Sequence, residues 1–375
     1  MKKIFILTGE TSGDKLASKV ISKLKILNNK IDYLSVSGDY IRALGIKSLY
    51  DLNEVTYLGF TKVFLNIFKI KKKINYTVKK IIEYNPDILF SVDSPDFTLR
   101  VSKEVKKMKP SIKTIHFVAP KVYVWRENRV KKLKYFIDHI LLLFPFEKKY
   151  FKKENIDSTF TGHPLLENYT NDNNDFTGLL NEKKKFISIY PGSRLSEIYT
   201  LIPILFKFIK LMDEKYHDIL FVFHSTKEHS NLIKKLVSYE NFQNCEVIND
   251  EKIKSSVLKK SIFAVSKSGT ISLEICNAKI PSIIIYKMNV INFFIIKLLV
   301  RVKFANIVNI AANEEIIPEL LQSNCNPNNI FNTVSNLIQD QDALEKQVYK
   351  TQEIIKTFKT DRSTEIACSV LINYL

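Results

Sequence analysis

The stretch from Lys185 to Ile198 constrains the fold of this chain more than any other. Its apolar run Phe186–Tyr190 has the length and composition of a buried strand. The run breaks at Pro191-Gly192, and a helix is expected to follow, with Ser193 as its N-cap and Glu197 in its first turn. A strand, a tight turn and a helix start are the repeating parts of an α/β fold.

The same turn is suited to phosphate. Free backbone N–H groups and the positive end of the helix dipole attract anions at a helix start. The guanidinium of Arg194 adds a planar fork that matches phosphate oxygens. Gly192, Ser193 and Arg194 are therefore candidate nucleotide-binding residues. On this loop alone, an ordinary βα turn with a surface arginine explains the pattern equally well.

A second turn of this kind follows the first strand of the chain, Ile4–Thr8. The turn reads GETSGD over Gly9–Asp14, which is not the GxGxxG of dinucleotide-binding proteins. Glu10 and Asp14 would repel a pyrophosphate, which argues against a dehydrogenase. Acids in this position could instead meet substrate hydroxyls. The competing interpretation is that Ser12 or Asp14 merely caps the helix.

The strand Asp87–Val92 ends directly at Asp93, where ligands of open α/β sheets bind. A carboxylate in that place is a candidate general base, and Asp93 is assigned that role. Asp96 is expected to cap a helix over Phe97–Met108 instead. His116, alone within the next strand, is expected to be a core residue and not a catalyst.

The strand and helix rhythm restarts in the second half of the chain. Ser266–Thr270 follows one of its strands and opens a helix that contains Glu274, so it forms a second loop suited to an anion. A glutamate one turn inside such a helix can accept hydrogen bonds from both ribose hydroxyls of a nucleotide. The expected strands are Phe186–Tyr190, Ile219–His224, Cys245–Ile248, Ile262–Val265 and Ser282–Tyr286.

The segment from Lys62 to Lys80 holds seven lysines and no acid. Its apolar residues follow helical spacing, and Phe64, Leu65 and Phe68 widen the apolar sector at one end. A basic amphipathic helix with added aromatics is typical of membrane-surface contact. A helix packed on the sheet, with a solvated basic face, is the alternative. The candidate membrane-contact residues are Val63, Phe64, Ile67, Phe68, Lys71, Lys72 and Lys73.

A chain of 375 residues is too long for one ordinary α/β domain. We expect a first domain over residues 1–167, a linker over 168–182 and a second domain over 183–342. Residues 343–375 are expected to form C-terminal helices that pack back on the first domain or exchange within a dimer.

The net charge of +18 indicates an anionic partner, whether nucleic acid, an anionic membrane or phosphorylated substrates. The four cysteines show no CxxC spacing and are typical of free thiols in a reducing compartment. No apolar run reaches the roughly 18 residues of a spanning helix. We therefore expect a cytoplasmic protein that can lie on a membrane.

Eight short motifs occur in one order along nearly the whole chain. Together they resemble lipid-A-disaccharide synthase, a glycosyltransferase family of the GT-B class. The motifs are GETSGD at Gly9–Asp14, VDSPDF at Val92–Phe97, VxVWR at Val122–Arg126, PFE at Pro145–Glu147, GHP at Gly162–Pro164, PGSR at Pro191–Arg194, SGTISLE at Ser268–Glu274 and PELLQ at Pro318–Gln322.

The resemblance implies two Rossmann-like domains facing across a cleft. It implies transfer of a 2,3-diacylglucosamine unit from UDP to 2,3-diacylglucosamine 1-phosphate (lipid X), giving lipid A disaccharide 1-phosphate and UDP. It further implies a peripheral protein on the inner face of the inner membrane of a Gram-negative bacterium. Members form dimers by exchanging C-terminal segments, so a homodimer is expected, and neither a metal nor another cofactor is needed.

The resemblance also implies residue roles. Asp93 matches the essential aspartate, and Glu10 and Ser12 match the N-terminal active-site turn. Arg194 matches the diphosphate loop, while the nucleotide side comprises Gly269, Thr270, Glu274 and Asn309. This chain departs from the family where Ala-Pro-Lys-Val-Tyr-Val-Trp replaces Ser-Pro-Ser-Val-Trp-Ala-Trp, at Lys121 and Tyr123 among others.

Two other function classes stay open. One is a different UDP-sugar enzyme of the same fold, either an epimerase or another transferase. The other is a basic module that binds nucleic acid or membranes without catalysis. A nucleic-acid module is disfavoured because its basic patch lacks interleaved aromatics, and because it would leave Asp93, Arg194 and Glu274 without a role.

Overall fold

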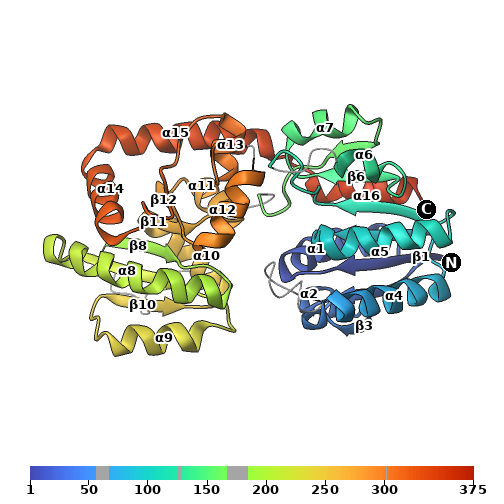
Figure 1. Cartoon of the computed structure of the whole chain (residues 1–375), viewed down its shortest axis with the longest axis horizontal. Coiled ribbons are helices and arrows are strands. Elements are labelled where there is room, and N and C mark those ends of the chain that lie inside the picture. The colour runs from blue at the N-terminus through green and yellow to red at the C-terminus, as the bar shows by residue number, and fades with distance from the viewer. Residues whose placement is uncertain (56–66, 125–128, 167–184, 301) are drawn as a thin grey trace. The chain divides into compact units, whose positions relative to one another are not determined.

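The computed structural model describes residues 1–55, 67–124, 129–166, 185–300 and 302–375. The chain divides into two compact units, each built around one sheet (Figure 1). Unit 1 comprises Met1–Asn168 with Phe358–Leu375, and unit 2 comprises Tyr169–Thr357. The segment 168–182, expected to be a linker, lies outside the described residues.

The sheet of unit 1 has seven parallel strands in the order β3-β2-β1-β4-β5-β6-β7. Because β1 lies between β2 and β4, the ends of the first and third predicted strands become neighbours, with Thr8 opposite Val92. The strands are β1 (Lys2–Thr8), β2 (Ile31–Ser37), β3 (Ser48–Asp51), β4 (Ile88–Val92), β5 (Lys113–Phe117), β6 (His139–Leu142) and β7 (Ser158–Phe160).

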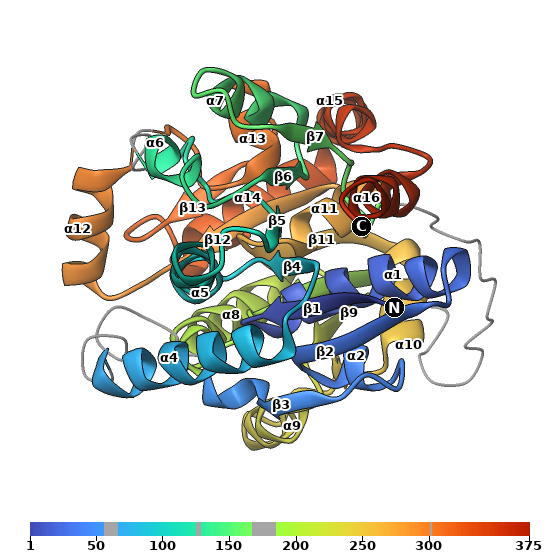
Figure 2. The same cartoon turned by 90° about the vertical axis from the view of Figure 1, so that its right-hand side faces the viewer.

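Helices cover both faces of this sheet (Figure 2). On one face lie α4 (Ile67–Tyr84) and α5 (Pro95–Met108), which share a core with Phe5 and Leu7 of β1. On the other face α1 (Thr11–Leu27) packs against α16 (Ser363–Asn373). Shorter pieces are α2 (Asp39–Arg42), α6 (Val130–Leu133), α7 (Lys148–Lys152) and the 3₁₀ turns η1 (Leu52–Glu54) and η3 (Pro145–Glu147).

Helix α4 shows which face of the basic segment is buried. Ile70, Ile74, Val78 and Ile81 are between 0% and 9% exposed and belong to the core of unit 1. For these four residues, the alternative of a helix packed on the sheet is therefore confirmed. Phe68, at the start of the helix, is 85% exposed and takes no part in that core.

The sheet of unit 2 has six parallel strands in the order β10-β9-β8-β11-β12-β13. Three of the five predicted strands have the predicted bounds; β8 begins one residue earlier than predicted, and β11 begins one residue earlier and ends two residues later. The strands are β8 (Lys185–Tyr190), β9 (Ile219–His224), β10 (Cys245–Ile248), β11 (Ser261–Lys267), β12 (Ser282–Tyr286) and β13 (Glu319–Leu321).

The main core of unit 2 lies between the sheet and three helices, α8 (Leu195–Lys215), α9 (Ser230–Tyr239) and α14 (Pro327–Gln339). The helices α10 (Glu251–Lys260) and α11 (Ile271–Asn277) contribute to smaller clusters with Phe186 and Tyr190. The remaining helices are α12 (Val290–Leu299), α13 (Ile307–Ala312) and α15 (Gln341–Phe358).

The predicted C-terminal helices are confirmed as α15, which begins at Gln341, and α16. The division into units falls at the end of α15, so this helix belongs to unit 2 and α16 to unit 1. Lys23 of α1 pairs with Glu365 of α16 over 2.9 Å, and the Cys368 thiol donates to the carbonyl of Val20. The last helix is thereby fixed to the first within one chain.

Candidate active site

Asp93 lies at the carboxyl end of β4 with its carboxylate held from two sides. Its Oδ1 accepts from the backbone N–H of Ser94 over 2.8 Å, and its Oδ2 accepts from the Ser12 hydroxyl over 3.2 Å. The backbone of Asp93 and Ser94 is left-handed, with φ of 55° and 45°. Two consecutive non-glycine residues in this region are strained, and such strain is typical of functional sites.

The start of α1 lies directly against this turn because Gly13 has no side chain. A Cβ on Gly13 would meet the carbonyl oxygen of Val92 at 3.0 Å and the Cβ of Asp93 at 3.2 Å. The close approach brings Ser12, which is exposed, to the carboxylate of Asp93. Glu10 is the N-cap residue of α1 and is half-buried. The structure thus brings Glu10, Ser12 and Asp93 to one edge of the sheet.

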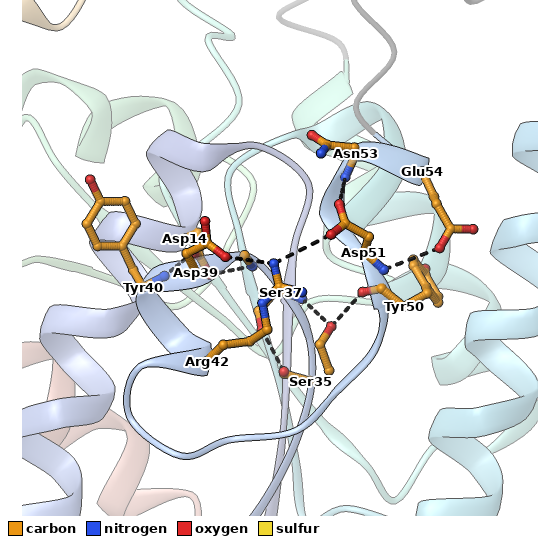
Figure 3. Close-up of polar contacts among 12 residues, drawn as sticks. Asp14, Ser35, Ser37, Asp39, Tyr40, Arg42, Tyr50, Asp51, Asn53 and Glu54 are labelled. Carbon is orange, nitrogen blue, oxygen red and sulfur yellow. Dashed lines mark hydrogen bonds and ion pairs between the residues drawn. The ribbon is translucent and has the colours of Figure 1, made fainter. Parts of the chain in front are cut away.

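Asp14, the last residue of GETSGD, has a different task (Figure 3). It is fully buried, and its two carboxylate oxygens accept from the backbone N–H groups of Gly38 and Tyr40, each over 2.9 Å. Burial raises the pKa of this carboxyl, while those hydrogen bonds oppose the rise. Asp14 therefore caps α2 and fixes the loop after β2, so it does not face substrate.

The loop fixed by Asp14 is part of a larger network of polar contacts, much of which is drawn in Figure 3. Arg42 pairs with Asp39 over 2.8 Å and reaches Asp51, which caps η1. Glu54 of η1 pairs with Lys73 of α4 over 2.6 Å. Lys73, a predicted membrane-contact residue, is therefore engaged within unit 1.

Two neighbouring polar residues are not part of the candidate site. The helix α5 begins at Pro95, two residues earlier than expected, so the prediction that Asp96 caps it is wrong. Proline is favoured at the first helical position, which explains the early start. Asp96 instead pairs with Arg129 over 3.3 Å. His116 is fully buried against Ser91, and burial lowers its pKa to about 3, which makes it a neutral core residue as expected.

Residues of three of the eight motifs, VxVWR, PFE and GHP, lie in or beside an aromatic cluster that also contains Phe358 at the end of α15. The Tyr123 ring contacts Phe146 edge-on at 5.1 Å, and Phe144 contacts Phe358 at 4.7 Å between ring centroids. The backbone N–H of His163 donates to the carbonyl of Phe358 over 3.0 Å. In unit 1 these motif residues therefore have a structural task. Trp125 and Arg126 of the same segment lie outside the described residues.

In unit 2, the turn after β8 is built around Glu197. The helix α8 begins at Leu195 with Arg194 as N-cap, so the prediction that Ser193 is the N-cap is wrong by one residue. Gly192 has φ of 108°, and a Cβ there would clash with Glu197 Oε2. That oxygen accepts from the backbone N–H of Ser193 over 3.2 Å. The carboxylate thus takes the place at the helix start that Ser193 was expected to fill.

Sequence reasoning missed a partner of Glu197. Lys267, the last residue of β11, places its Nζ 3.0 Å from Glu197 Oε1. The two residues are far apart in the sequence, and only the pairing of β8 with β11 brings them together. The available signal was a lysine at the end of a buried strand, within the loop already considered suited to an anion.

The other predicted nucleotide-binding residues belong to the loop after β11, to α11 and to α13, and they differ in exposure. Gly269 and Thr270 are exposed in the loop before α11, and Glu274 is half-buried one turn into that helix. Asn309 is fully buried, and its amide donates to the Ile317 carbonyl and to Glu319 Oε1 over 2.7 and 2.8 Å. Its Oδ1 accepts two backbone N–H groups, so the whole amide is used within unit 2.

Among the predicted membrane-contact residues, Phe68, Lys71 and Lys72 are exposed. Val63, Phe64 and the side chain of Ile67 lie outside the described residues. None of the helices in the described ranges combines the length and apolar content needed to cross a membrane. Across the same ranges, no group of three His, Cys, Asp or Glu side chains is placed to hold a metal ion.

Solved structures share this architecture across nearly the whole chain. The UDP-GlcNAc 2-epimerase of Neisseria meningitidis, bound to UDP-GlcNAc, matches with a TM-score of 0.66 and 15% identity, over 99% of this chain and 100% of its own. The glycotransferase of kitacinnamycin matches with a TM-score of 0.65 and 14% identity, over 100% and 99%. At such identities the likeness shows the fold alone, which is the GT-B class of two parallel-sheet α/β domains.

The sequence comparisons identify the family within this class. A model described as lipid-A-disaccharide synthetase matches residues 4–372. The lipid-A-disaccharide synthase of Rickettsia prowazekii (strain Madrid E) is 34% identical over 99% of both chains, and that of Rickettsia typhi (strain ATCC VR-144 / Wilmington) is 33% identical over the same shares. The chain belongs to the lipid-A-disaccharide synthase family, and it is a glycosyltransferase of lipid A biosynthesis.

Proposed function

We propose that this chain joins UDP-2,3-diacylglucosamine to 2,3-diacylglucosamine 1-phosphate. The C1–oxygen bond to the diphosphate breaks, a glycosidic bond to the acceptor hydroxyl forms, and UDP leaves. The products are lipid A disaccharide 1-phosphate and UDP. Membership of the family supports these substrates. The structural observation that supports the chemistry is the carboxylate of Asp93, which is oriented by hydrogen bonds from Ser12 and Ser94.

Asp93 is the general base in this proposal. The acceptor hydroxyl is a weak nucleophile, and it must lose its proton as the new bond forms. The hydrogen bonds from Ser94 N–H and Ser12 Oγ orient the carboxylate and leave it further lone pairs for that proton. Ser12 thus positions the base, and Glu10, the N-cap residue of α1, is assigned to the acceptor hydroxyls in this proposal.

Unit 2 binds the nucleotide in this proposal. The diphosphate gains charge as it leaves, and oriented cations and N–H groups stabilise that charge. Arg194 is 43% exposed and the turn of Gly192 and Ser193 precedes α8, so both are accessible to a ligand. Gly269, Thr270 and Glu274 are assigned to the nucleoside. Asn309 is assigned an indirect role in nucleotide binding, because its hydrogen bonds fix Glu319 and the backbone of Ile316 and Ile317.

The acyl chains of both substrates place the enzyme at a membrane in this proposal. Phe68 supplies exposed apolar area, and Lys71 and Lys72 supply charge that attracts anionic lipids. A net charge of +18 acts in the same direction. We assign the protein to the cytoplasmic side of the inner membrane of a Gram-negative bacterium. A homodimer is a further part of the proposal, and light scattering of the purified chain tests it.

The direct test is to incubate the purified chain with both lipids in mixed micelles and to follow the products by mass spectrometry. We expect the disaccharide 1-phosphate and UDP to form in equal amounts. A parallel incubation with UDP-GlcNAc alone tests for 2-epimerisation. A changed UDP-sugar without consumption of the lipid acceptor would contradict the proposal and would favour an epimerase.

A further inference from the structure

The side chain of Lys267 lies where three neighbouring strands of unit 2 end. Residues before it on β11 pair with β8, Ser266 opposite Tyr190, and with β12 on the other side. Its Nζ is 3.0 Å from Glu197 Oε1 and 5.3 Å from the centre of the Tyr286 ring at the end of β12. The lysine side chain is only 19% exposed, so its position is set by these neighbours.

Glu197 gathers several donors around one carboxylate. Besides Lys267, it receives the backbone N–H of Ser193 over 3.2 Å, and Arg194 Nη1 lies 3.9 Å from its Oε1. The Glu197 side chain is 10% exposed. A buried carboxylate needs such partners, because an unpaired charge in this environment is costly. Glu197 therefore holds two cations side by side at the start of α8.

The two cations outnumber the carboxylate by one, so this cluster keeps a positive charge. An ammonium group has three N–H donors, so a lysine can serve more than one acceptor at a time. Lys267 can thus stay on Glu197 and still donate to a second anion. The pair also joins the loop after β8 to the loop after β11, which the sequence presents as two separate loops suited to anions.

We propose that Lys267 is a second cationic contact for the diphosphate of UDP, held in place by Glu197 and acting beside Arg194. The inference rests on the proposed function, which assigns the diphosphate to the loop of Arg194. It adds a residue that lies outside the motif PGSR and that the sequence patterns did not single out. Glu197 is a positioning residue here, because it acts through the two cations.

The test measures UDP affinity by titration calorimetry on the full chain. Lys267→Met is expected to weaken UDP binding about tenfold or more, as for the loss of one charge-assisted hydrogen bond. Lys267→Arg keeps a cation and should restore most of that affinity. Lys185→Met is the charge-matched control, because Lys185 pairs with Asp218 on the surface at the opposite end of β8, and UDP affinity should not change.

Lys267→Met leaves Glu197 poorly paired and could destabilise the fold, so the double variant Lys267→Met/Glu197→Gln is measured as well. This variant removes the buried carboxylate charge together with the lysine. Weakened UDP binding in the folded double variant supports the inference. Wild-type affinity in the double variant, together with weakened binding in Arg194→Ala, overturns the inference about Lys267. The assignment of the diphosphate to the loop of Arg194 would then still be supported. Unchanged affinity in Arg194→Ala as well would show that the loop itself is wrongly assigned.

Discussion

The Ser12 hydroxyl donates to Asp93 Oδ2 over 3.2 Å, although 81 positions separate the two residues. The contact joins the turn after β1 to the turn after β4, and these strands are neighbours in the sheet of unit 1. It therefore gives the motifs GETSGD and VDSPDF one shared site.

The first prediction concerns the base. Asp93→Asn keeps the size of the side chain and can still accept hydrogen bonds, but it cannot take up a proton at neutral pH. Loss of a positioned base typically lowers the rate by about 10²–10⁴-fold. We expect a loss of that size in single-turnover measurements with saturating lipids, while UDP affinity stays near the wild-type value.

Asp96→Asn is the matched control for this experiment. Asp96 lies three residues further on, and its carboxylate pairs with Arg129 at the surface. Such exposed pairs contribute about 0–1 kcal/mol to stability, so activity should hardly change. A near-normal chemical step in Asp93→Asn would refute the assignment and would move the search for the base to Glu10.

The second prediction separates Asp14 from its neighbours in the motif. Asp14→Asn turns an NH₂ group towards one of two backbone N–H groups, that of the buried Gly38 or that of the part-buried contact with Tyr40, so that one of them loses its acceptor. An unsatisfied buried donor costs about 1–3 kcal/mol. Urea unfolding should show a loss of this size. Asp39→Asn, in the same loop but with a 94% exposed side chain, should cost under about 1 kcal/mol, and equal losses would contradict the capping role.

Much of this fold follows from local sequence patterns. Apolar runs predict Ile219–His224 and Ser282–Tyr286 with the observed bounds, because strands buried on both faces are continuous apolar segments. The partly exposed edge strand Cys245–Ile248 also has the predicted bounds. The errors lie at helix starts. Ser193 and Asp96 both have side chains that favour an N-cap. In α8, however, the carboxylate of Glu197 in the first turn accepts the Ser193 N–H, and in α5 an early proline starts the helix before Asp96.

The candidate site was less accessible to sequence reasoning. Asp93 is a candidate base because it directly follows a strand, a rule that needs no tertiary information. The contact between Lys267 and Glu197 depends on the order of strands in a sheet, which no short motif encodes. The internal hydrogen bonds of Asn309 likewise connect α13 with the segment before β13 and are invisible to local patterns.

The third prediction tests the membrane contact. Phe68 is 85% exposed, so Phe68→Ser should reduce co-sedimentation with vesicles of phosphatidylglycerol without lowering the unfolding temperature. Ile74→Ser is the control on the same helix, because Ile74 is 7% exposed and belongs to the core. That variant should lose stability by about 2–5 kcal/mol, as for a core truncation. Unchanged vesicle binding in Phe68→Ser would show that this residue does not contact the membrane.

The fourth prediction concerns Glu147, the last residue of the motif PFE. Its side chain is almost fully buried, and one oxygen accepts from the backbone N–H of Phe144 over 3.1 Å. Burial raises the pKa of this carboxyl from 4.5 to about 8, against a smaller opposing effect of the hydrogen bonds and Lys121. At neutral pH the folded protein therefore keeps a proton on Glu147 that the unfolded chain has released.

The sign of the pH dependence follows from this difference. Because the folded state binds the extra proton between pH 4.5 and 8, the free energy of unfolding falls as pH rises through that window, by up to about 1.4 kcal/mol per pH unit. The buried His116, His163 and His224, with pKa values lowered to about 3, act in the opposite sense, and their effect fades about one pH unit above the unfolded pKa of about 6.5. Urea unfolding between about pH 7.5 and 8 is therefore dominated by Glu147, and comparison with a variant that lacks this carboxyl cancels what the histidines still contribute. Glu147→Gln keeps an acceptor for Phe144 and should flatten the decline, whereas equal slopes in both proteins would show that Glu147 is ionised in the fold.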